Sequence, residues 1–402
     1  MARSRTVTAS ERNTPRYVVW EVTTLCDHAC GHCGSRAWKA RDDELDLTET
    51  LAVADQLAAL GTKEVTLIGG EAYLFDGVLT LVRHLTDLGI RVSIQTGGWG
   101  ITPELARELK KAGLRALGFS VDGTAETHDV LRAKEGSHAR ALAGIRIARE
   151  AGLVVASNTQ VNRLTAPVLE ETALLLKDAG VQVWRCQLTV PMGRAADAAE
   201  WLLEPWQMLD VMDTLGSLQI RFAEEAAASG AGLKGLFNIV AGNNLGYYSP
   251  HEMILRSDPG GAARHWKGCQ AGVYTMSIES DGTIKACPSL PTAPYKAGNV
   301  RDVKLDEVWH TEPLLNFVQE RDTSELWGFC AECEYGAICG AGCSFTTTCT
   351  MGRRGNNPFC YHRAKTLKDR GQRERLVQVM HAIGERYDFG RFETAVEDWP
   401  SA

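Results

Sequence analysis

The chain has 402 residues, of which 44% are hydrophobic and 23% charged, proportions that are ordinary for a globular protein with a large core. The net charge of −7 and the lack of a long basic run give no reason to expect a nucleic-acid partner. No stretch approaches the roughly 18 to 20 apolar residues of a membrane span, and the N-terminus lacks the apolar region of a secretory signal, so we expect a cytoplasmic protein without a membrane partner.

Six short β-rich runs alternate with helical stretches in the first half of the chain. They lie in the segments 16–25, 60–70, 88–98, 112–123, 151–161 and 179–188. The last five follow helical stretches that end in Ala-Gly or Leu-Gly, and glycine is the usual stop after the last helical turn. Largely apolar runs are typical of parallel strands covered by helices. The pattern predicts an α/β fold of six βα units, either an incomplete barrel or an open doubly wound sheet.

Polar and glycine-rich motifs follow three of these runs. The stretch "TLCDHACGHCG" comes after the first run, "GGE" (69–71) after the second, and "SVDG" (120–123) straddles the end of the fourth. In both candidate folds, chemistry belongs at the C-terminal ends of the strands. We therefore expect the functional site where these three motifs meet.

The first motif contains three of the twelve cysteines, and clustered cysteines in a reducing compartment indicate metal binding or redox chemistry. Cys26, Cys30 and Cys33 have the spacing C-x3-C-x2-C. An iron–sulfur cubane held by three thiolates keeps one iron open for a substrate or cofactor. Structural zinc takes four ligands, and His28 and His32 could complete such a set. The spacing favours the cluster and leaves zinc as an alternative.

A C-x3-C-x2-C loop after a first strand, followed in order by the GGE and SVDG motifs, resembles the signature of radical S-adenosylmethionine (SAM) enzymes. This resemblance implies a partial (β/α)6 TIM-like barrel and a SAM-binding 4Fe-4S cluster held by Cys26, Cys30 and Cys33. The open iron would chelate the methionine part of SAM. An electron from the cluster would then cleave SAM and release a 5′-deoxyadenosyl radical.

The resemblance also implies which residues contact SAM. They are Gly69, Gly70 and Glu71 for its amino group, Ser120 and Arg132 for its carboxylate, and Asn158 and Leu188 for its ribose and adenine. Two positions depart from the family pattern: Ala72 replaces a proline after the GGE motif, and His32 replaces an aromatic residue before the third cysteine. His32 would either stack near the adenine or face water.

The segment 269–360 contains eight more cysteines. Seven of them, spaced around Gly282, resemble the SPASM domain appended to many radical SAM enzymes that mature peptides. The resemblance implies two auxiliary Fe–S clusters of the 4Fe-4S type, one held by Cys269, Cys287 and Cys343 and the other by Cys330, Cys333, Cys339 and Cys360. The fourth position of the first cluster could stay open, take another ligand or recruit Cys349. A pair of zinc ribbons is the alternative.

Two cysteines remain outside these sets. Cys186 shares a strand face with Trp184 and Leu188, so we expect it to face the barrel interior if Leu188 faces the cofactor. There its thiol could donate a hydrogen atom to a substrate radical, although a buried small hydrophobe is the simpler interpretation. Cys349 is predicted to be a loop thiol.

The predicted domain organisation has five parts. They are an N-terminal tail (1–15), the radical SAM barrel (16–195), a bridging segment (196–262), the SPASM domain (263–365) and a C-terminal helix or tail (366–402). The bridge is expected to be helical around residue 201 and strand-like near 222. We expect the SPASM domain to be held by its ligands more than by a core.

Together the motifs predict an enzyme that abstracts hydrogen from a ribosomal peptide or protein and installs a crosslink, an oxidation or an epimerisation. The resemblance implies an electron donor such as flavodoxin or ferredoxin. Only 25 residues precede Cys26, which leaves no room for an additional leader-recognition domain there. A separate leader-binding protein, or the bridging segment, would then hold the peptide leader.

Three alternatives remain. One is a sulfatase-maturase-like enzyme that forms formylglycine, but Pro288 stands where that group has an aspartate base. Another is a cofactor maturase that acts on a small precursor peptide. The third is a non-catalytic Fe–S or zinc scaffold.

Overall fold

The computed structural model describes residues 14–230 and 232–400, so the predicted tail 1–15 lies almost wholly outside the described residues. Ten strands form one sheet in the order β10-β9-β8-β1-β2-β3-β4-β5-β6-β7. The six predicted strands are all present, as β1 (Tyr17–Thr23), β2 (Glu64–Gly69), β3 (Arg91–Thr96), β4 (Ala116–Ser120), β5 (Val154–Val161) and β6 (Val183–Leu188). They pair in parallel in chain order, and β7 (Asn238–Ala241) extends them at one edge.

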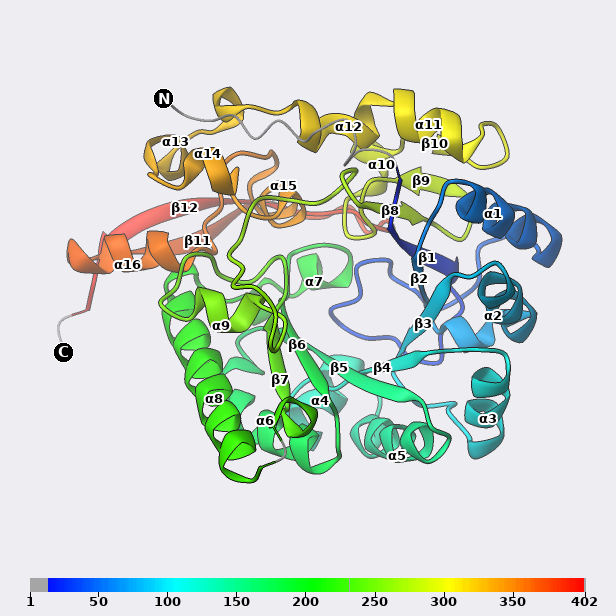
Figure 1. Ribbon diagram of the computed structural model, residues 1–402. Coiled ribbons are helices and arrows are strands. Elements are labelled where there is room, and N and C mark those ends of the chain that lie inside the picture. The colour runs from blue at the N-terminus through cyan, green and yellow to red at the C-terminus, as the bar shows by residue number, and fades with distance from the viewer. Residues whose placement is uncertain (1–13, 231, 401–402) are drawn as a thin grey trace.

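Six helices lie along the outside of the curved sheet, which confirms the incomplete barrel (Figure 1). They are α1 (Leu47–Ala59), α2 (Val78–Asp87), α3 (Pro103–Lys111), α5 (Ser137–Glu150), α6 (Leu169–Asp178) and α8 (Met208–Ala228). The shorter helices α4 (Ala125–Arg132) and α7 (Arg194–Asp197) contact the cysteine loop, and α9 (Glu252–Arg256) follows β7. Asp46 caps α1 with a reciprocal capping box to Glu49, and Thr102 caps α3 ahead of a proline in its first turn.

Phe119 marks the face of the sheet that packs against the helices. A Cβ at Gly144 of α5 would lie 2.7 Å from the Phe119 ring, so the helix can approach this closely only because residue 144 is glycine. The parallel register aligns Phe119 with Ser157 and Ser157 with Trp184, which therefore share this face. Side chains at the alternate positions, among them Gln95, point into the barrel.

The SPASM segment continues the barrel sheet. Strand β8 (Thr275–Ile278) pairs in parallel with β1, and β9 (Thr283–Lys285) and β10 (Gly298–Asn299) follow as antiparallel strands. The helices of this segment are α10 (Thr292–Tyr295), α11 (Leu305–Thr311), α12 (Pro313–Glu320), α13 (Phe329–Glu332), α14 (Gly336–Cys339) and α15 (Ser344–Met351). Met276, Leu315 and Phe359 belong to the same buried cluster as the barrel strands. The segment therefore has a hydrophobic core in addition to its cysteines.

Two predicted elements differ in the structure. α8 runs without interruption from Met208 to Ala228, and the strand-like end expected near residue 222 is wrong. Phe222 is buried against Phe237, so the apolar run there forms one face of a helix. No helix among the described residues is both long enough and apolar enough to span a bilayer.

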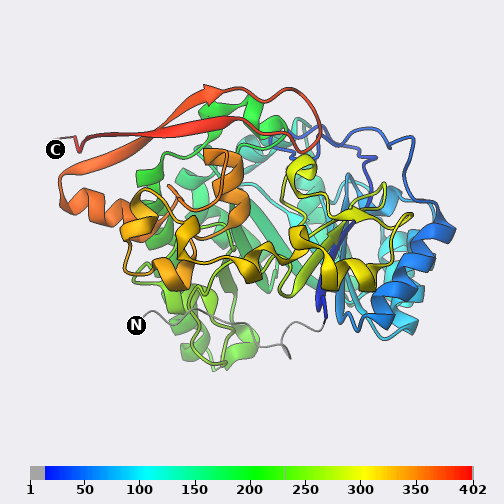
Figure 2. The ribbon, with the colours of Figure 1, turned by 90° about the horizontal axis from the view of Figure 1, so that it is seen from above.

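The C-terminal segment also differs from the predicted helix or tail. α16 (Tyr361–Asp369) is followed by a hairpin of β11 (Gln372–Met380) and β12 (Arg391–Asp398), visible as a long ribbon across the molecule (Figure 2). A buried ion pair of 2.5 Å between Arg363 and Glu374 fixes the hairpin to α16. The loop between the two strands returns to the mouth of the barrel, where the Tyr387 amide donates to the carbonyl of Gly34 at 3.0 Å.

Replacing Phe119 with alanine should lower the free energy of unfolding by about 3 to 5 kcal/mol, because it leaves a cavity between the sheet and α5. Val130→Ala is a suitable control: Val130 is 55% exposed on α4, and its truncation should change stability by about 0.5 kcal/mol or less. Urea unfolding of the two anaerobically prepared variants measures both effects. Equal losses would contradict the packing described for Phe119.

Candidate active site and metal centres

The loop that contains Cys26, Cys30 and Cys33 is fixed to the barrel at several points. The Cys26 amide donates to the carbonyl of Trp38 at 3.2 Å, and the Gly31 amide donates to Leu131 at the end of α4 at 2.9 Å. The Arg194 guanidinium donates to the Cys30 carbonyl at 2.6 Å. The three thiols therefore lie at the carboxyl end of β1, as the motif predicts.

The sulfur atoms of this loop have hydrogen-bond donors close to them. The His28 amide lies 3.4 Å from the Cys26 sulfur, a guanidinium nitrogen of Arg132 lies 3.8 Å from the Cys30 sulfur, and the Ser35 hydroxyl lies 3.5 Å from the Cys33 sulfur. Burial raises the pKa of the Cys30 thiol to about 11. Donors around buried sulfurs suit thiolates that bind a metal cluster, since such bonds stabilise the sulfur charge.

The zinc alternative finds less geometric support. Four ligands around one zinc would hold sulfur atoms roughly 3.8 Å apart, given a Zn–S distance of about 2.3 Å. Among the described residues, one group of ligand atoms lies within 4.8 Å of each other, and it consists of Cys26, Asp27, His28 and Glu71. This group includes only one of the three cysteines. The loop is thus better suited to a larger cluster than to one ion.

Arg132 and Asp122 form a buried ion pair beside this loop. The guanidinium donates to Asp122 at 2.6 and 2.8 Å while its other end approaches the Cys30 sulfur. Burial alone would raise the pKa of Asp122, but Arg132 and His32 hold it well below its usual range. His32 lies 3.2 Å from the Leu131 carbonyl and 3.4 Å from Asp122, with 7% of its side chain exposed. The expectation that His32 might face water is therefore wrong.

The GGE motif packs directly on the cysteine loop. The Gly70 amide donates to Thr23, and the Glu71 amide donates to Leu25, each at 2.8 Å. A Cβ at Gly70 would lie 2.1 Å from the Leu25 carbonyl oxygen, so this close approach requires glycine. The Glu71 carboxylate accepts bonds of 2.6 Å from Thr96 and from the Gly97 amide, while burial raises its pKa to about 7.

Several residues around this loop escaped the sequence interpretation. Asp27 accepts hydrogen bonds from Tyr73 and His28, and the Lys134 ammonium donates to its carbonyl. Lys134 also lies 3.7 Å above the Trp99 ring. Asp27 could have been noticed because it lies inside the cysteine motif. The other residues come from distant segments and carry no such signal.

The remaining predicted SAM contacts lie on opposite faces of the strands. Ser120 and Asn158 are aligned neighbours on the inner face, where the Asn158 amide donates to Gln95. Leu188 lies four residues after Trp184 on β6, so both side chains point to the helix-facing side, where Leu188 is buried. Its backbone amide and carbonyl both bond to Asn244, at 3.2 and 2.9 Å.

Cys186 shares that helix-facing side, so its predicted position in the barrel interior is wrong. It is aligned with Thr159, which accepts a hydrogen bond from the Trp184 indole, and it is fully buried in the hydrophobic cluster. Burial raises the pKa of its thiol well above the usual value. Period-two alternation grouped the residues of β6 correctly, but it did not indicate which group faces inward.

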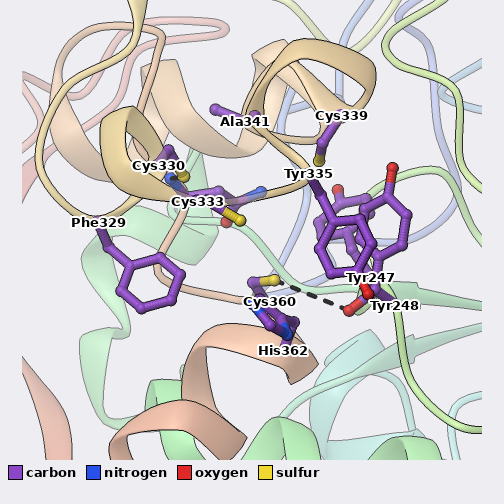
Figure 3. A pocket seen from close by; sticks show the side chains of 12 residues that line it. Tyr247, Tyr248, Phe329, Cys330, Cys333, Tyr335, Cys339, Ala341, Cys360 and His362 are labelled. Carbon is purple, nitrogen blue, oxygen red and sulfur yellow. Dashed lines mark hydrogen bonds between the residues drawn. The ribbon is translucent and has the colours of Figure 1, made fainter.

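Four cysteines of the SPASM segment line one cavity (Figure 3). The cysteines are Cys330, Cys333, Cys339 and Cys360, the set that the family resemblance implies for the second auxiliary cluster. Aromatic rings surround them, including Tyr248 and Tyr335, which stack with centroids 4.0 Å apart. The Asn357 amide lies 3.5 Å from the Cys330 sulfur. A pocket lined by four thiols suits an iron–sulfur cluster, which four cysteine thiolates usually bind.

The other SPASM cysteines form a second group. Burial, together with the neighbouring Cys269 and Cys287, raises the pKa of the Cys343 thiol to about 12. Cys349 is fully buried on α15 near Cys343, so its prediction as a loop thiol is wrong. Its position leaves it available as a fourth ligand beside the predicted three.

Comparison with known proteins agrees with this geometry and defines the class. Residues 20–176 match the Radical SAM superfamily, and residues 269–334 match SPASM, an iron–sulfur cluster-binding domain. An AdoMet-dependent heme synthase of Methanosarcina barkeri (strain Fusaro / DSM 804) is 30% identical over 354 residues, which are 87% of this chain and 97% of that protein. The chain therefore belongs to the radical SAM superfamily, carries a SPASM domain and is an enzyme.

Other similar proteins have different names. Mycofactocin maturase MftC of Mycobacterium ulcerans (strain Agy99) is 28% identical over 334 residues, or 82% of this chain and 83% of that one. Streptococcus suis SuiB bound to S-adenosylmethionine has a TM-score of 0.63 at 16% identity over 87% of this chain and 76% of that one. Native anSMEcpe with bound AdoMet has the same TM-score at 17% identity over 87% and 95%. These two structures confirm the fold.

Gly70→Ala should prevent the cysteine loop from docking on β2, because the added carbon would collide with the Leu25 carbonyl. We expect the anaerobically reconstituted variant to hold about four fewer irons per chain and to show no SAM-dependent change in its electron paramagnetic resonance (EPR) spectrum. Gly261→Ala is the control, since its added carbon would meet only Asp258, at 3.2 Å or more. A Gly70 variant with full iron and a normal SAM response would contradict the assigned role of this contact.

Proposed function

We propose that this enzyme uses SAM to abstract hydrogen from a peptide or protein substrate and so installs a post-translational modification. Cys26, Cys30 and Cys33 are the residues that would hold a 4Fe-4S cluster with one open iron. When bound, this cluster supplies the electron that cleaves SAM. The observation that carries the choice of substrate is the amide-rich inner face of the barrel.

Four carboxamide side chains lie on three neighbouring strands, on the face that points into the barrel. They are Gln95 on β3, Asn158 and Gln160 on β5, and Gln187 on β6. Asn158 donates to Gln95, and Gln160 donates to Gln187 at 3.3 Å. Carboxamides offer both donors and acceptors without charge, which matches the repeating N–H and C=O groups of a peptide backbone.

Two cations near the mouth of the barrel have partners. Arg132 pairs with Asp122, while Arg194 donates to the carbonyls of Cys30 and Ala37 at 2.6 and 3.0 Å. A porphyrin with several carboxylate groups would call for free guanidinium or ammonium groups at this end of the barrel. Arg185 on β6 is such a group, since it is exposed and is aligned with Asn158 of the inner face. The charge distribution therefore does not decide between a peptide and a porphyrin.

A tetrapyrrole is nevertheless a second candidate substrate, and sequence similarity favours it. Three similar proteins are named AdoMet-dependent heme synthases, and the matches cover 97%, 90% and 94% of their lengths. The formylglycine alternative receives less support, because Pro288 occupies the position at which that group has its base. Among these three, we retain the peptide as the proposed substrate.

The roles of the remaining residues follow from their positions. Arg132, held in place by Asp122, would bind the SAM carboxylate together with Ser120. Gly69, Gly70 and Glu71 would contact the SAM amino group, and Asn158 would contact the ribose. Leu188 remains a proposed contact to the adenine only through its backbone, since its side chain lies in the core.

The SPASM cysteines would hold two auxiliary 4Fe-4S clusters. Cys269, Cys287 and Cys343 would hold the first, with Cys349 available as a fourth ligand. The cavity of Figure 3 would hold the second. An electron donor such as flavodoxin or ferredoxin, and a separate leader-binding protein, complete the proposed set of partners.

Cys30→Ala should abolish formation of 5′-deoxyadenosine from SAM under reducing conditions, because it removes a ligand of the SAM-binding cluster. Cys333→Ala should retain part of this activity and yet form no modified product. Iron and sulfide analysis of the anaerobic wild-type protein should give about twelve irons for three cubanes. Retained SAM cleavage by the Cys30 variant, or zinc without sulfide in the wild type, would refute the ligand assignment.

The substrate class can be tested directly with the holoenzyme, SAM and a reductant. We expect a mass change on a short peptide encoded beside the gene when the two are co-expressed. A parallel reaction with iron-coproporphyrin III should leave the porphyrin unchanged. Conversion of the porphyrin with no change in the peptide would establish the tetrapyrrole alternative instead.

A further inference from the structure

Arg185 is a cation on the inner face of the barrel. It lies in the middle of β6, which stands between β5 and β7 (Figure 1). The parallel register aligns it with Asn158 of β5 and Val240 of β7. Its neighbours Trp184 and Cys186 have no exposed surface on the helix-facing side, whereas Arg185 is exposed. Because side chains alternate along a strand, the guanidinium projects into the barrel.

The inner face around Arg185 is less tightly packed than the face that meets the helices. Ala156, Asn158 and Gln160 point inward from β5 and are each half-buried, and so is Gln187 on β6. A closed barrel, by contrast, fills its interior with layers of side chains. Solvent therefore reaches the inner face of this barrel, as a substrate must.

Arg185 has no counter-ion on this face. In the part of the chain that the structure describes, no hydrogen bond or ion pair joins its guanidinium to another group. The other inward cation of strands β1 to β7 is Arg91, at the start of β3, and it pairs with Glu64 at 3.2 Å. The inward carboxylate of Glu21 lies 3.4 Å from Arg41. The charge of Arg185 is therefore left for a ligand.

The guanidinium faces β1 across the barrel. Burial raises the pKa of the Tyr17 phenol, while a hydrogen bond to Thr66 and the charge of Arg185 oppose this rise, so Arg185 lies within electrostatic range of Tyr17. Leu188 ends β6, and Arg185 precedes it by three residues, or about 10 Å along a strand. A group bound by Arg185 would therefore lie deeper in the barrel than the motifs at the carboxyl ends of the strands.

The surroundings of Arg185 suit a carboxylate. A guanidinium presents a planar fork of donors that matches the two oxygens of this group. Gln160 donates to the oxygen of Gln187, and the Gln187 amide keeps its own N–H donors for another partner. The carboxamides carry no charge, so one guanidinium neutralises a single carboxylate but only half of a doubly charged phosphate.

We propose that Arg185 binds a carboxylate of the substrate inside the barrel and so fixes which part of the substrate lies at the barrel mouth. This inference rests on the proposed function, because it requires a substrate held within the barrel. In a peptide the carboxylate would be an aspartate or glutamate side chain or the C-terminus, and in a porphyrin it would be a propionate. Arg185 is thus a residue that determines substrate specificity.

The test combines acidic and neutral substrates with charged and neutral side chains. The probes are the peptide encoded beside the gene and iron-coproporphyrin III, each as the free acid and as the methyl ester. Arg185→Gln removes the charge, and Arg185→Lys keeps it. Arg107→Gln is the matched control, since Arg107 is exposed on α3, outside the barrel. Dissociation constants are measured with the anaerobic holoenzyme in the presence of SAM.

We expect Arg185→Gln to weaken binding of the acid form about 10- to 100-fold, because a charge-assisted hydrogen bond is lost. Esterification should weaken binding to the wild type by a similar factor and leave binding to Arg185→Gln unchanged. Arg185→Lys should retain most of the affinity, and Arg107→Gln should bind as the wild type does. The iron content of each variant checks its folding, and the esterification arm on the wild type needs no variant.

The outcomes separate this inference from the proposed function. Equal affinity of the wild type for the acid and the ester, or the same loss on esterification in the wild type and in Arg185→Gln, overturns the inference and leaves the proposed function intact. An effect seen with the porphyrin alone supports the inference and replaces the peptide by the tetrapyrrole alternative. A wild-type holoenzyme that binds neither probe overturns both.

Discussion

The close contact between the GGE motif and the cysteine loop is the constraint on which the site depends. The amides of Gly70 and Glu71, just after β2, donate to the carbonyls of Thr23 at the end of β1 and of Leu25 in the loop, and a Cβ at Gly70 would collide with the Leu25 carbonyl. Gly70 thereby fixes the position of Cys26 relative to the sheet. Because the loop has little regular structure of its own, this contact converts the order of the parallel strands into a defined arrangement of thiols.

Strained backbone in the described residues lies near the cysteine loop, the SPASM cavity and the hairpin loop. Among the residues that the structure describes, five non-glycine residues have positive φ angles: Arg36, Ala133, Tyr248, Ala341 and Tyr387. Arg36 follows the cysteine loop and Ala133 follows α4. Tyr248 and Ala341 line the cavity of Figure 3, and Tyr387 lies where the hairpin meets the barrel. Such conformations cost about 1 to 3 kcal/mol each, so their concentration beside cysteines and the SAM motifs agrees with a functional role for these loops.

Sequence patterns revealed the parts that depend on short-range regularity. The six strands were predicted from the alternation of helical and β-rich runs, whereas the SAM contacts and the grouping of the four cavity cysteines were implied by the family resemblance. The facing of Cys186 was not, because alternation groups residues without orienting them. The C-terminal hairpin was missed because a mixed run such as "RERLVQV" fits a helix or a strand, and the deciding contact with Arg363 is tertiary.

The pairing of β8 with β1 explains how two cysteine groups can act as one site. Trp20 of β1 is aligned with Ile278 of β8, and both strands run in the same direction. Their carboxyl ends therefore lie at one edge of a single sheet, with the loop of Cys26 after one strand and Glu279 after the other. Arg41 bridges Glu21 and Glu279 across this edge. Hydrogen bonds of the sheet, and not a flexible linker, set the distance between the SAM motif and the auxiliary cysteines.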